Sequence, residues 1–325
     1  MKNISQTITF FIFIISFSIS NVLAGYIFIS NEGSDNITVI DLDTYKILAN
    51  IESGKRPRDM KIIPEKNQLL VAASEDDRIN IINYKSYEII GSVETGDDPE
   101  IFDISPDGKI IVVSNEDDNE ATIIDSSTGK IIRVVEDVGI EPEGVTFSPD
   151  GTLVYITSEG TNTVIIIDPW KGEIIDEVLV GNRPRRGAFV KNGKEYWVTN
   201  ELGGSVSVID TSNHKVIDKI EFFIKGIRKS EITPVDFAIS HNQKFAYITL
   251  GRSKHVAVVD VDTHEVKDYI LAGARVWGAA ITKDDKFLIV TNGNNDNISI
   301  IDTKKNAAIK SISVGRTPHT VRILE

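Results

Sequence analysis

The chain of 325 residues contains no cysteine. This absence excludes disulfide bonds, zinc–thiolate sites, iron–sulfur clusters and covalently attached c-type haem. A chain without thiols also cannot mispair in an oxidising compartment. The fold must therefore be held together by packing and hydrogen bonds, without a covalent cross-link.

The sequence also lacks an apolar run long enough to cross a membrane. Its N-terminal apolar stretch, residues 8–19, is well short of the roughly 20 residues that a transmembrane helix needs. Lys2 precedes this stretch, and Val22-Leu23-Ala24 follows it as a cleavage site. We expect residues 1–24 to be a cleavable secretory signal peptide, with a retained anchor as the alternative. The mature chain is then periplasmic and has no membrane span.

An excess of positive charge is missing as well. The chain has 35 Lys and Arg residues against 48 Asp and Glu residues, and its net charge is −13 at pH 7. Nucleic acids and anionic membrane surfaces repel such a chain on average. We expect no nucleic-acid partner, and we interpret the acidic surface as a solvated one or as a match for a cationic partner.

What the sequence does contain is one pattern in seven copies. The acidic turn Ser30-Asn31-Glu32 lies between two runs of β-branched residues, and we interpret it as recurring in every later copy. The second run ends successively in Asp41, Asn83, Asp125, Asp168, Asp210, Asp260 and Asp302. These positions are 42 or 43 residues apart, except for the 50 residues between Asp210 and Asp260. A period of this length is typical of propeller blades.

The period predicts an all-β fold, a seven-bladed β-propeller that forms a single domain over residues 25–325 and has four antiparallel strands in each blade. The mature chain begins in a second strand, residues 26–30, and ends in an inner strand, residues 318–324. We therefore expect the C-terminal strand to close the first blade. Closure of this kind removes the open sheet edge that a ring would otherwise expose.

The longest step of the repeat contains an insertion at residues 221–231. Phe222 and Phe223 are apolar, whereas Arg228 and Lys229 are basic. One interpretation is a loop packed over the ring by its own aromatic side chains. The other is a docking element for a partner, because insertions in repeat proteins often lie on the binding face.

Residues 196–200 (YWVTN) and 287–292 (FLIVTN) resemble the YVTN β-propeller repeat, and the resemblance covers essentially the whole mature chain. Seven repeats and an export signal are similar to one subgroup, the PQQ-dependent catabolism-associated β-propeller proteins. This resemblance implies a periplasmic role beside alcohol oxidation or transport. The partners that it implies are a periplasmic dehydrogenase, a cytochrome or a transporter component. The chain lacks the eight blades, the cysteine pair and the calcium loop of the quinone enzymes themselves, so we predict no cofactor.

Charged side chains gather where the outer strand of one blade leads into the inner strand of the next. This blade order places those connections at one mouth of the central channel. The candidate binding residues there are Arg56, Arg58, Glu100, Glu143, Arg185, Arg186, Arg275, Trp277, Arg316 and His319. Guanidinium groups suit a carboxylate or another small anion. The alternative, which we favour, is internal pairing with Glu32, Glu116, Glu159 and Glu201 on the adjacent turns.

No catalytic motif stands out. The five histidines lie in turns or near strand ends and make a poor metal set, and no Ser-His-Asp order or phosphate loop is present. We predict no catalytic residue and no metal ligand. The sequence favours a non-enzymatic binding module. The alternative is a propeller enzyme, lactonase-like or an auxiliary oxidoreductase, that uses a metal or cofactor at the channel mouth.

Overall fold

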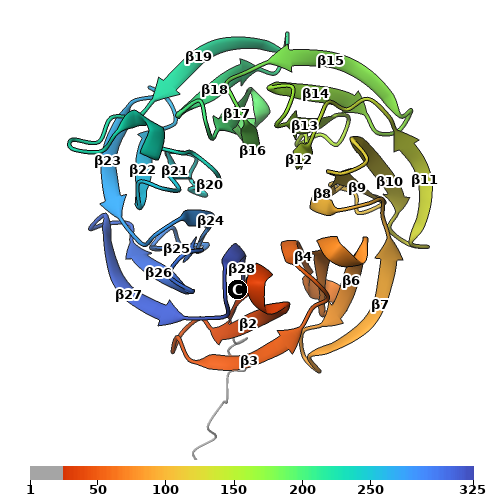
Figure 1. The fold of residues 1–325 in the computed structure, drawn as a ribbon, viewed down its shortest axis with the longest axis horizontal. Coiled ribbons are helices and arrows are strands. Elements are labelled where there is room, and N and C mark those ends of the chain that lie inside the picture. Colours follow the sequence, from red (N-terminus) through yellow and green to blue (C-terminus); the bar gives the residue numbers. More distant parts are fainter. Residues whose placement is uncertain (1–24) are drawn as a thin grey trace, which may run out of the picture.

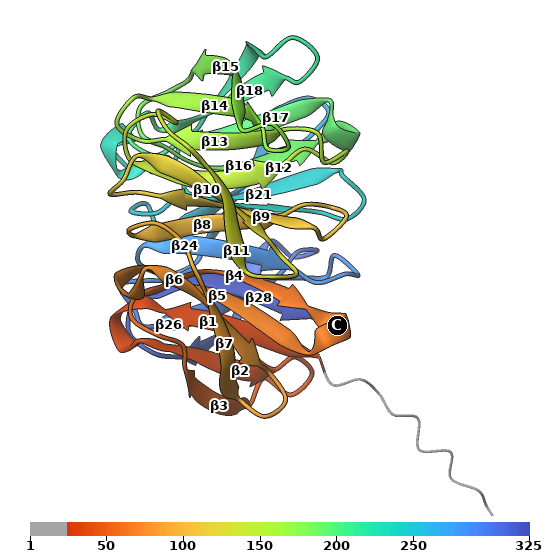
Figure 2. The same ribbon diagram turned by 90° about the vertical axis from the view of Figure 1, so that its right-hand side faces the viewer.

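The computed structural model describes residues 25–325, which form 28 strands in seven four-stranded antiparallel sheets. The sheets are arranged as blades around a central channel (Figure 1). Seen from the side, the ring is a thick disc (Figure 2). The predicted signal peptide, residues 1–24, lies outside the described residues. The prediction of a seven-bladed propeller is confirmed.

Blade 1 joins the two ends of the chain and is ordered β28-β1-β2-β3. Its strands are β28 (Pro318–Leu324), β1 (Tyr26–Asn31), β2 (Asn36–Asp41) and β3 (Ile47–Glu52). Pairing of Tyr26 with Leu324 and of Ile27 with Ile323 places the C-terminal strand innermost, as predicted. The edge that a linear chain would leave open is therefore covered by its own last strand.

Blades 2 to 7 follow in chain order, each from an inner to an outer strand. Blade 2 consists of β4 (Pro57–Ile63), β5 (Gln68–Ala73), β6 (Arg78–Asn83) and β7 (Glu88–Glu94). Blade 3 consists of β8 (Pro99–Ile104), β9 (Ile110–Asn115), β10 (Glu120–Asp125) and β11 (Lys130–Val135). Blade 4 consists of β12 (Pro142–Phe147), β13 (Val154–Ser158), β14 (Thr163–Asp168) and β15 (Glu173–Leu179).

The last three blades have the same order. Blade 5 consists of β16 (Pro184–Val190), β17 (Glu195–Asn200), β18 (Ser205–Asp210) and β19 (Lys215–Glu221). Blade 6 consists of β20 (Phe237–Ile239), β21 (Phe245–Thr249), β22 (His255–Asp260) and β23 (Val266–Leu271). Blade 7 consists of β24 (Val276–Ile281), β25 (Phe287–Asn292), β26 (Asn297–Asp302) and β27 (Ala307–Ser313). Single 3₁₀ turns are η1 (Glu32–Ser34), η2 (Pro64–Lys66), η3 (Ser74–Asp76), η4 (Lys191–Gly193) and η5 (Lys229–Glu231).

The hydrophobic core lies between neighbouring blades rather than inside any one of them. One buried cluster joins Trp197 and Val208 of blade 5 to Ile248 and Val259 of blade 6. Another joins blade 7 to blade 1. The middle strands are apolar on both faces because each face packs on a different blade. The seven blades therefore depend on one another for burial, and the ring places their inner ends around one channel.

Candidate functional site

One mouth of the central channel contains a cavity of about 610 Å³. Its lining residues include Glu32, Arg56, Arg58, Glu116, Arg183, Arg185, Glu201, Glu231, Arg252, Lys254, Arg275 and Trp277. We call this cavity, together with the side chains that lie around it at the same end of the channel, the channel mouth. Its wall is mostly polar, and the lining arginines and lysine outnumber the lining glutamates. A cavity of this size is within the range that small-molecule sites occupy.

The innermost ring of the channel mouth is made by the first side chain after each blade's entry into its inner strand. In blades 1 to 7 these residues are His319, Arg58, Glu100, Glu143, Arg185, Val235 and Trp277, and all are buried. A proline precedes them in every blade except blade 7, where Val276 takes its place. Proline fixes φ and has no N–H to pair, so it suits the first position of a strand.

Most of these residues accept a hydrogen bond at their backbone carbonyl from a hydroxyl group of the neighbouring blade. Thr199 Oγ1 of blade 5 donates to the carbonyl of Val235 in blade 6 at 2.8 Å. Thr249 and Thr291 do the same for Trp277 at 2.7 Å and His319 at 2.8 Å. Equivalent bonds come from Ser30, Ser114 and Thr157. The hydroxyl position of the repeat therefore sets the position of the ring, a role that the sequence interpretation missed.

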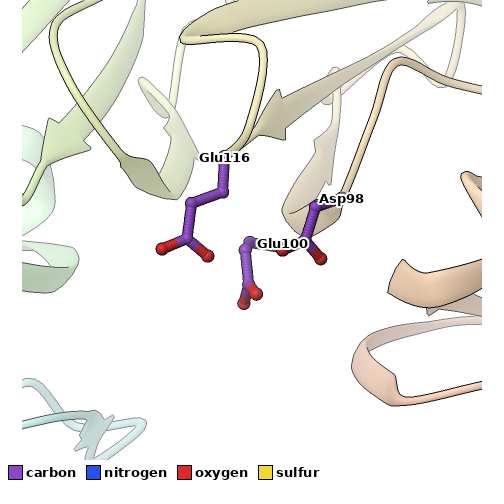
Figure 3. Close-up of side chains that lie close together, drawn as sticks. All are labelled: Asp98, Glu100 and Glu116. Atoms are coloured by element: carbon purple, nitrogen blue, oxygen red, sulfur yellow. The ribbon is translucent and has the colours of Figure 1, made fainter.

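Blades 3 and 4 contribute only acids to the channel mouth, and we call this the acidic side. Its six carboxylates belong to Asp98, Glu100, Glu116, Glu141, Glu143 and Glu159. Those of Glu100 and Glu116 point the same way from their strands, with Asp98 beside them (Figure 3). Burial raises the pKa of Glu100 well above its ordinary value, and Glu143 and Glu116 add to the rise against the pull of Arg58.

Two pairs of arginines flank the acidic side and pair with four of its carboxylates. In blade 2, Arg56 Nη1 lies 2.9 Å from Asp98, Arg56 Nη2 lies 3.1 Å from Glu100, and Arg58 is also paired with Glu100. In blade 5, Arg185 Nη2 lies 3.0 Å from Glu143, and both Arg183 and Arg185 are paired with Glu159. Of the four glutamates of the internal-pairing alternative, Glu32, Glu159 and Glu201 lie within 4.0 Å of these arginines, whereas Glu116 has no cation within that distance among residues 25–325.

Two sets of carboxylates could ligate one metal ion each. They are Asp98, Glu100 and Glu116, and Glu116, Glu141 and Glu159, with Glu116 common to both. Arg56 already donates to both oxygens of Asp98 at 2.9 Å. The guanidinium groups thus supply the positive charge that an ion would otherwise bring.

Blades 6 and 7 form the opposite, cationic side of the channel mouth. The prediction that the acidic turn recurs in every copy is wrong here. The position of Glu32 is taken by Glu116, Glu159 and Glu201 in three blades, but by Ser74 in blade 2 and by Gly251 and Gly293 in blades 6 and 7. Loss of the carboxylate leaves Arg252, Lys254 and Arg275 without an acidic partner within 4.0 Å among residues 25–325.

Trp277 supplies the aromatic surface of the cationic side. Its ring centroid lies 4.4 Å from Cζ of Arg275 and 5.1 Å from Cζ of Arg185. Burial lowers the pKa of Arg275, and the nearby guanidinium groups of Arg185 and Arg58 lower it further, although Glu32 opposes the shift. The surrounding residues therefore compensate the positive charge of Arg275 only in part.

His319 is neutral in this surrounding. Trp277 Nε1 donates to its Nε2 at 2.6 Å, which leaves the proton on Nδ1, 3.1 Å from Thr320 Oγ1. Burial and the four nearby arginines, Arg58 foremost, hold the pKa of His319 well below 6.5. Both ring nitrogens are thus occupied, and His319 positions Trp277 instead of offering a metal ligand.

Two predicted binding residues lie outside the channel mouth. Arg316 is exposed on the rim, because the position that turns Arg56, Arg183 and Arg275 inward belongs to Thr317 in blade 1 (φ 50°). Arg186 is one residue further along its strand and lies deeper in the channel. There it is 3.9 Å from Asp59 and 4.0 Å from Asp236, in a separate cavity of about 170 Å³.

The insertion at residues 221–231 packs Phe222 and Ile224 against blades 5 and 6 and brings Glu231 to the channel mouth. Phe222 is buried in their shared core, so the packed-loop interpretation holds for this side chain. Phe223 is 79% exposed. Arg228 pairs with Glu231 at 3.0 Å, and Lys229 pairs with Glu221 at 3.1 Å.

Fold and site together define a seven-bladed propeller with a charged, closed-ring cavity at one end of its channel. The model of the YNCE-like β-propeller family matches residues 64–323, and the chain belongs to that family. Protein NirF of Stutzerimonas stutzeri is 26% identical over 107 residues, which are 33% of this chain and 26% of NirF. The match thus spans about a quarter of that relative.

Solved structures agree on the fold. Kuenenia stuttgartiensis hydrazine synthase has a chain with a TM-score of 0.77 and 21% identity, covering 85% of this chain and 92% of that one. The periplasmic gluconolactonase PpgL of Pseudomonas aeruginosa has a TM-score of 0.77 and 18% identity, covering 93% of this chain and 99% of that one. At these identities the likeness shows the fold alone. In residues 25–325 we find no helix with the length and hydropathy of a membrane span.

Proposed function

We propose that this chain is an exported, non-enzymatic binding propeller that holds a small organic anion in the channel mouth. One observation carries the proposal. Within the described residues, Arg252, Lys254 and Arg275 line the same cavity without a carboxylate within 4.0 Å, whereas the arginines of the flanking blades 2 and 5 are paired.

The chemistry of the cationic side favours a carboxylate on a flat framework. A guanidinium group binds a carboxylate through two parallel hydrogen bonds, and Arg275 has no carboxylate within 4.0 Å among residues 25–325. Trp277 offers an apolar, flat surface next to it. Because Arg275 is partly desolvated among other arginines, an anion there relieves repulsion as well as forming bonds.

The cellular setting of the proposal comes from the predicted signal peptide and from the likeness to PpgL, which is a periplasmic protein by its description. A role beside PQQ-dependent alcohol oxidation, with a periplasmic dehydrogenase, cytochrome or transporter component as partner, stays part of this proposal. PQQ is itself a flat polycarboxylate, so it belongs in the panel of ligands to be tried.

The test is calorimetric titration of the mature chain with PQQ, gluconate and benzoate, in the wild type and in Arg275→Met. We expect at least one anion to bind and the variant to bind it about tenfold more weakly or worse, the scale of one lost charge-assisted contact. Arg316→Met is the matched control, because Arg316 is exposed outside the cavity. Equal binding by wild type and Arg275→Met would remove the cationic side as the site.

A second candidate, a lactonase-like enzyme with a metal ion, rests on the closeness of Asp98, Glu100 and Glu116. Metal analysis of the purified protein and a hydrolysis assay with gluconolactone and added Ca²⁺ distinguish the two. A stoichiometric ion and turnover that falls in Glu116→Gln would favour the enzyme. Tight anion binding without turnover favours the binding protein.

A further inference from the structure

The channel mouth has an unmatched group of each sign. On the acidic side, Glu116 is the carboxylate that lines the cavity without a cation within 4.0 Å among residues 25–325, since Arg56, Arg58, Arg183 and Arg185 are paired with other acids. Burial raises the pKa of Glu116, and the neighbouring carboxylate of Glu143 raises it further. A positive charge beside Glu116 would relieve this repulsion.

The unmatched groups face each other across the ring. Glu116 belongs to blade 3, whereas Arg252 and Lys254 belong to blade 6 and Arg275 to blade 7. Blades 6 and 7 lie on the far side of the channel from blade 3 (Figure 1). All four residues line one cavity of about 610 Å³, so a single small molecule can reach both walls.

From this arrangement we infer that the ligand is an organic zwitterion, with its carboxylate toward Arg275, Arg252 and Lys254 and an ammonium group toward Glu116. The inference rests on the proposed anion-binding function and deepens it. A dicarboxylate would bring its second charge against Glu116 and the carboxylates behind it, and like charges at short range are unfavourable. In a diamine, the second ammonium group would be repelled by the arginines in the same way.

Selectivity follows from the same two walls. A monocarboxylate satisfies the cationic side and leaves Glu116 unmatched. A zwitterion of the right length satisfies both sides and adds one charge-assisted hydrogen bond, which corresponds to about tenfold in affinity. The ring is rigid and closed, so a limited range of chain lengths will span it.

The experiment titrates the full mature chain at neutral pH with three homologous series. These are the ω-amino carboxylates from 4-aminobutanoate to 8-aminooctanoate, the n-alkanoates of equal length, and the matching α,ω-dicarboxylates. We expect one or two amino carboxylates to bind about tenfold more tightly than the alkanoate of equal length. The dicarboxylates should bind no more tightly than the alkanoates.

Two variants locate the ammonium group. In Glu116→Gln the ratio between amino carboxylate and alkanoate affinity should fall to near one. Glu173→Gln is the control, because Glu173 is an exposed acid on the outer strand of the adjacent blade and does not line the cavity, and it should keep the wild-type ratio. Unfolding curves of both variants show whether the ring is intact.

The outcomes separate this inference from the function on which it rests. If alkanoates bind but no amino carboxylate binds more tightly than the alkanoate of equal length, the zwitterion inference is wrong and the anion-site proposal is retained. If an advantage persists in Glu116→Gln, the ammonium group lies elsewhere and the inference is overturned. If no carboxylate of any series binds and Arg275→Met changes nothing, both the inference and the anion site fall.

Discussion

The acidic and cationic sides of the channel mouth are built from the same repeat but differ in the sign of their charges and in how far those charges are paired. On the acidic side, four of the six carboxylates of blades 3 and 4 are paired with two pairs of arginines, and half of these ten groups are buried. On the cationic side, Gly251 and Gly293 replace the acid of the turn, and three cations line open space.

The difference in pairing between the two sides separates the charges that stabilise the fold from the charges that are available to a ligand. Removing one member of a buried ion pair leaves the other charge uncompensated, so the acidic side is constrained by its own partners. A cation that faces a cavity without an acid carries no such constraint. Ligand binding is therefore expected where the repeat is broken, and stability where it is kept.

The largest effect is expected from opening the ring between the two sides. Strand β28 packs against β24 of blade 7 and β4 of blade 2, and it supplies the inner strand of blade 1. Deleting everything after Arg316 exposes the edge of β1 and removes His319 from the channel mouth. We expect the truncated protein to lose its cooperative unfolding transition, measured by circular dichroism, and to aggregate, measured by light scattering. Deleting only the exposed Glu325 is the control, and equal melting temperatures for the two truncations would contradict closure by β28.

Next in size is the loss of one arginine from the acidic side. Arg185→Met removes one partner from each of two buried carboxylates, and it leaves Glu143 with Arg58 at 3.8 Å and Glu159 with Arg183. We expect a loss of about 3–5 kcal/mol in the free energy of unfolding by urea. Arg185→Met combined with Glu159→Gln should recover part of this loss. Arg275→Met on the cationic side should cost far less. Equal losses for Arg185→Met and Arg275→Met would erase the distinction between the two sides.

The ring and the place of the acidic side follow from local patterns in the sequence. The residue after each loop proline is expected at the mouth, and the structure places Arg58, Glu100, Glu143 and Arg185 there. This works because a blade is built from neighbouring segments, so its period, turns and strand order determine which side chains meet.

The cationic side could not be predicted in the same way. It depends on the absence of a carboxylate from the turn. Arg252 and Lys254 line the cavity without a nearby acid because Gly251 and Gly293 occupy the position that is a glutamate in other blades. Pairing is also a three-dimensional property, since Arg56 and Arg316 occupy similar loops but differ by one residue in register. A turn-by-turn comparison of the residue after Asn31, Asn115, Asn200 and Asn292 would have been the available signal.

A smaller effect of opposite sign is expected at Glu116. Because its pKa is raised in the fold, its contribution to stability is fully present below the ordinary value of 4.5 and is lost as pH rises through the folded-state pKa. Glu116→Gln should therefore match the wild type at pH 4 and gain less than about 1 kcal/mol toward pH 7. Urea unfolding across this pH range is the measurement, with Glu173→Gln on the outer strand β15 as control. A loss of stability at pH 7 would place Glu116 among the structural ion pairs.

The smallest effect is expected from Phe223, which lies on the rim of the cationic side and outside the cavity. Phe223 is 79% exposed and does not line the channel mouth, and only its backbone N–H is engaged, by Tyr269 Oη at 2.8 Å. Phe223→Ser keeps that bond, so we expect a change in melting temperature below about 2 °C and unchanged anion affinity. Phe222→Ala, one residue earlier, empties a buried site and should destabilise by about 3–5 kcal/mol. If Phe223→Ser instead weakens anion binding, the side chain of Phe223 reaches the channel mouth in solution. If it abolishes only the retention of a purified dehydrogenase or cytochrome, the rim is a docking surface distinct from the ligand site.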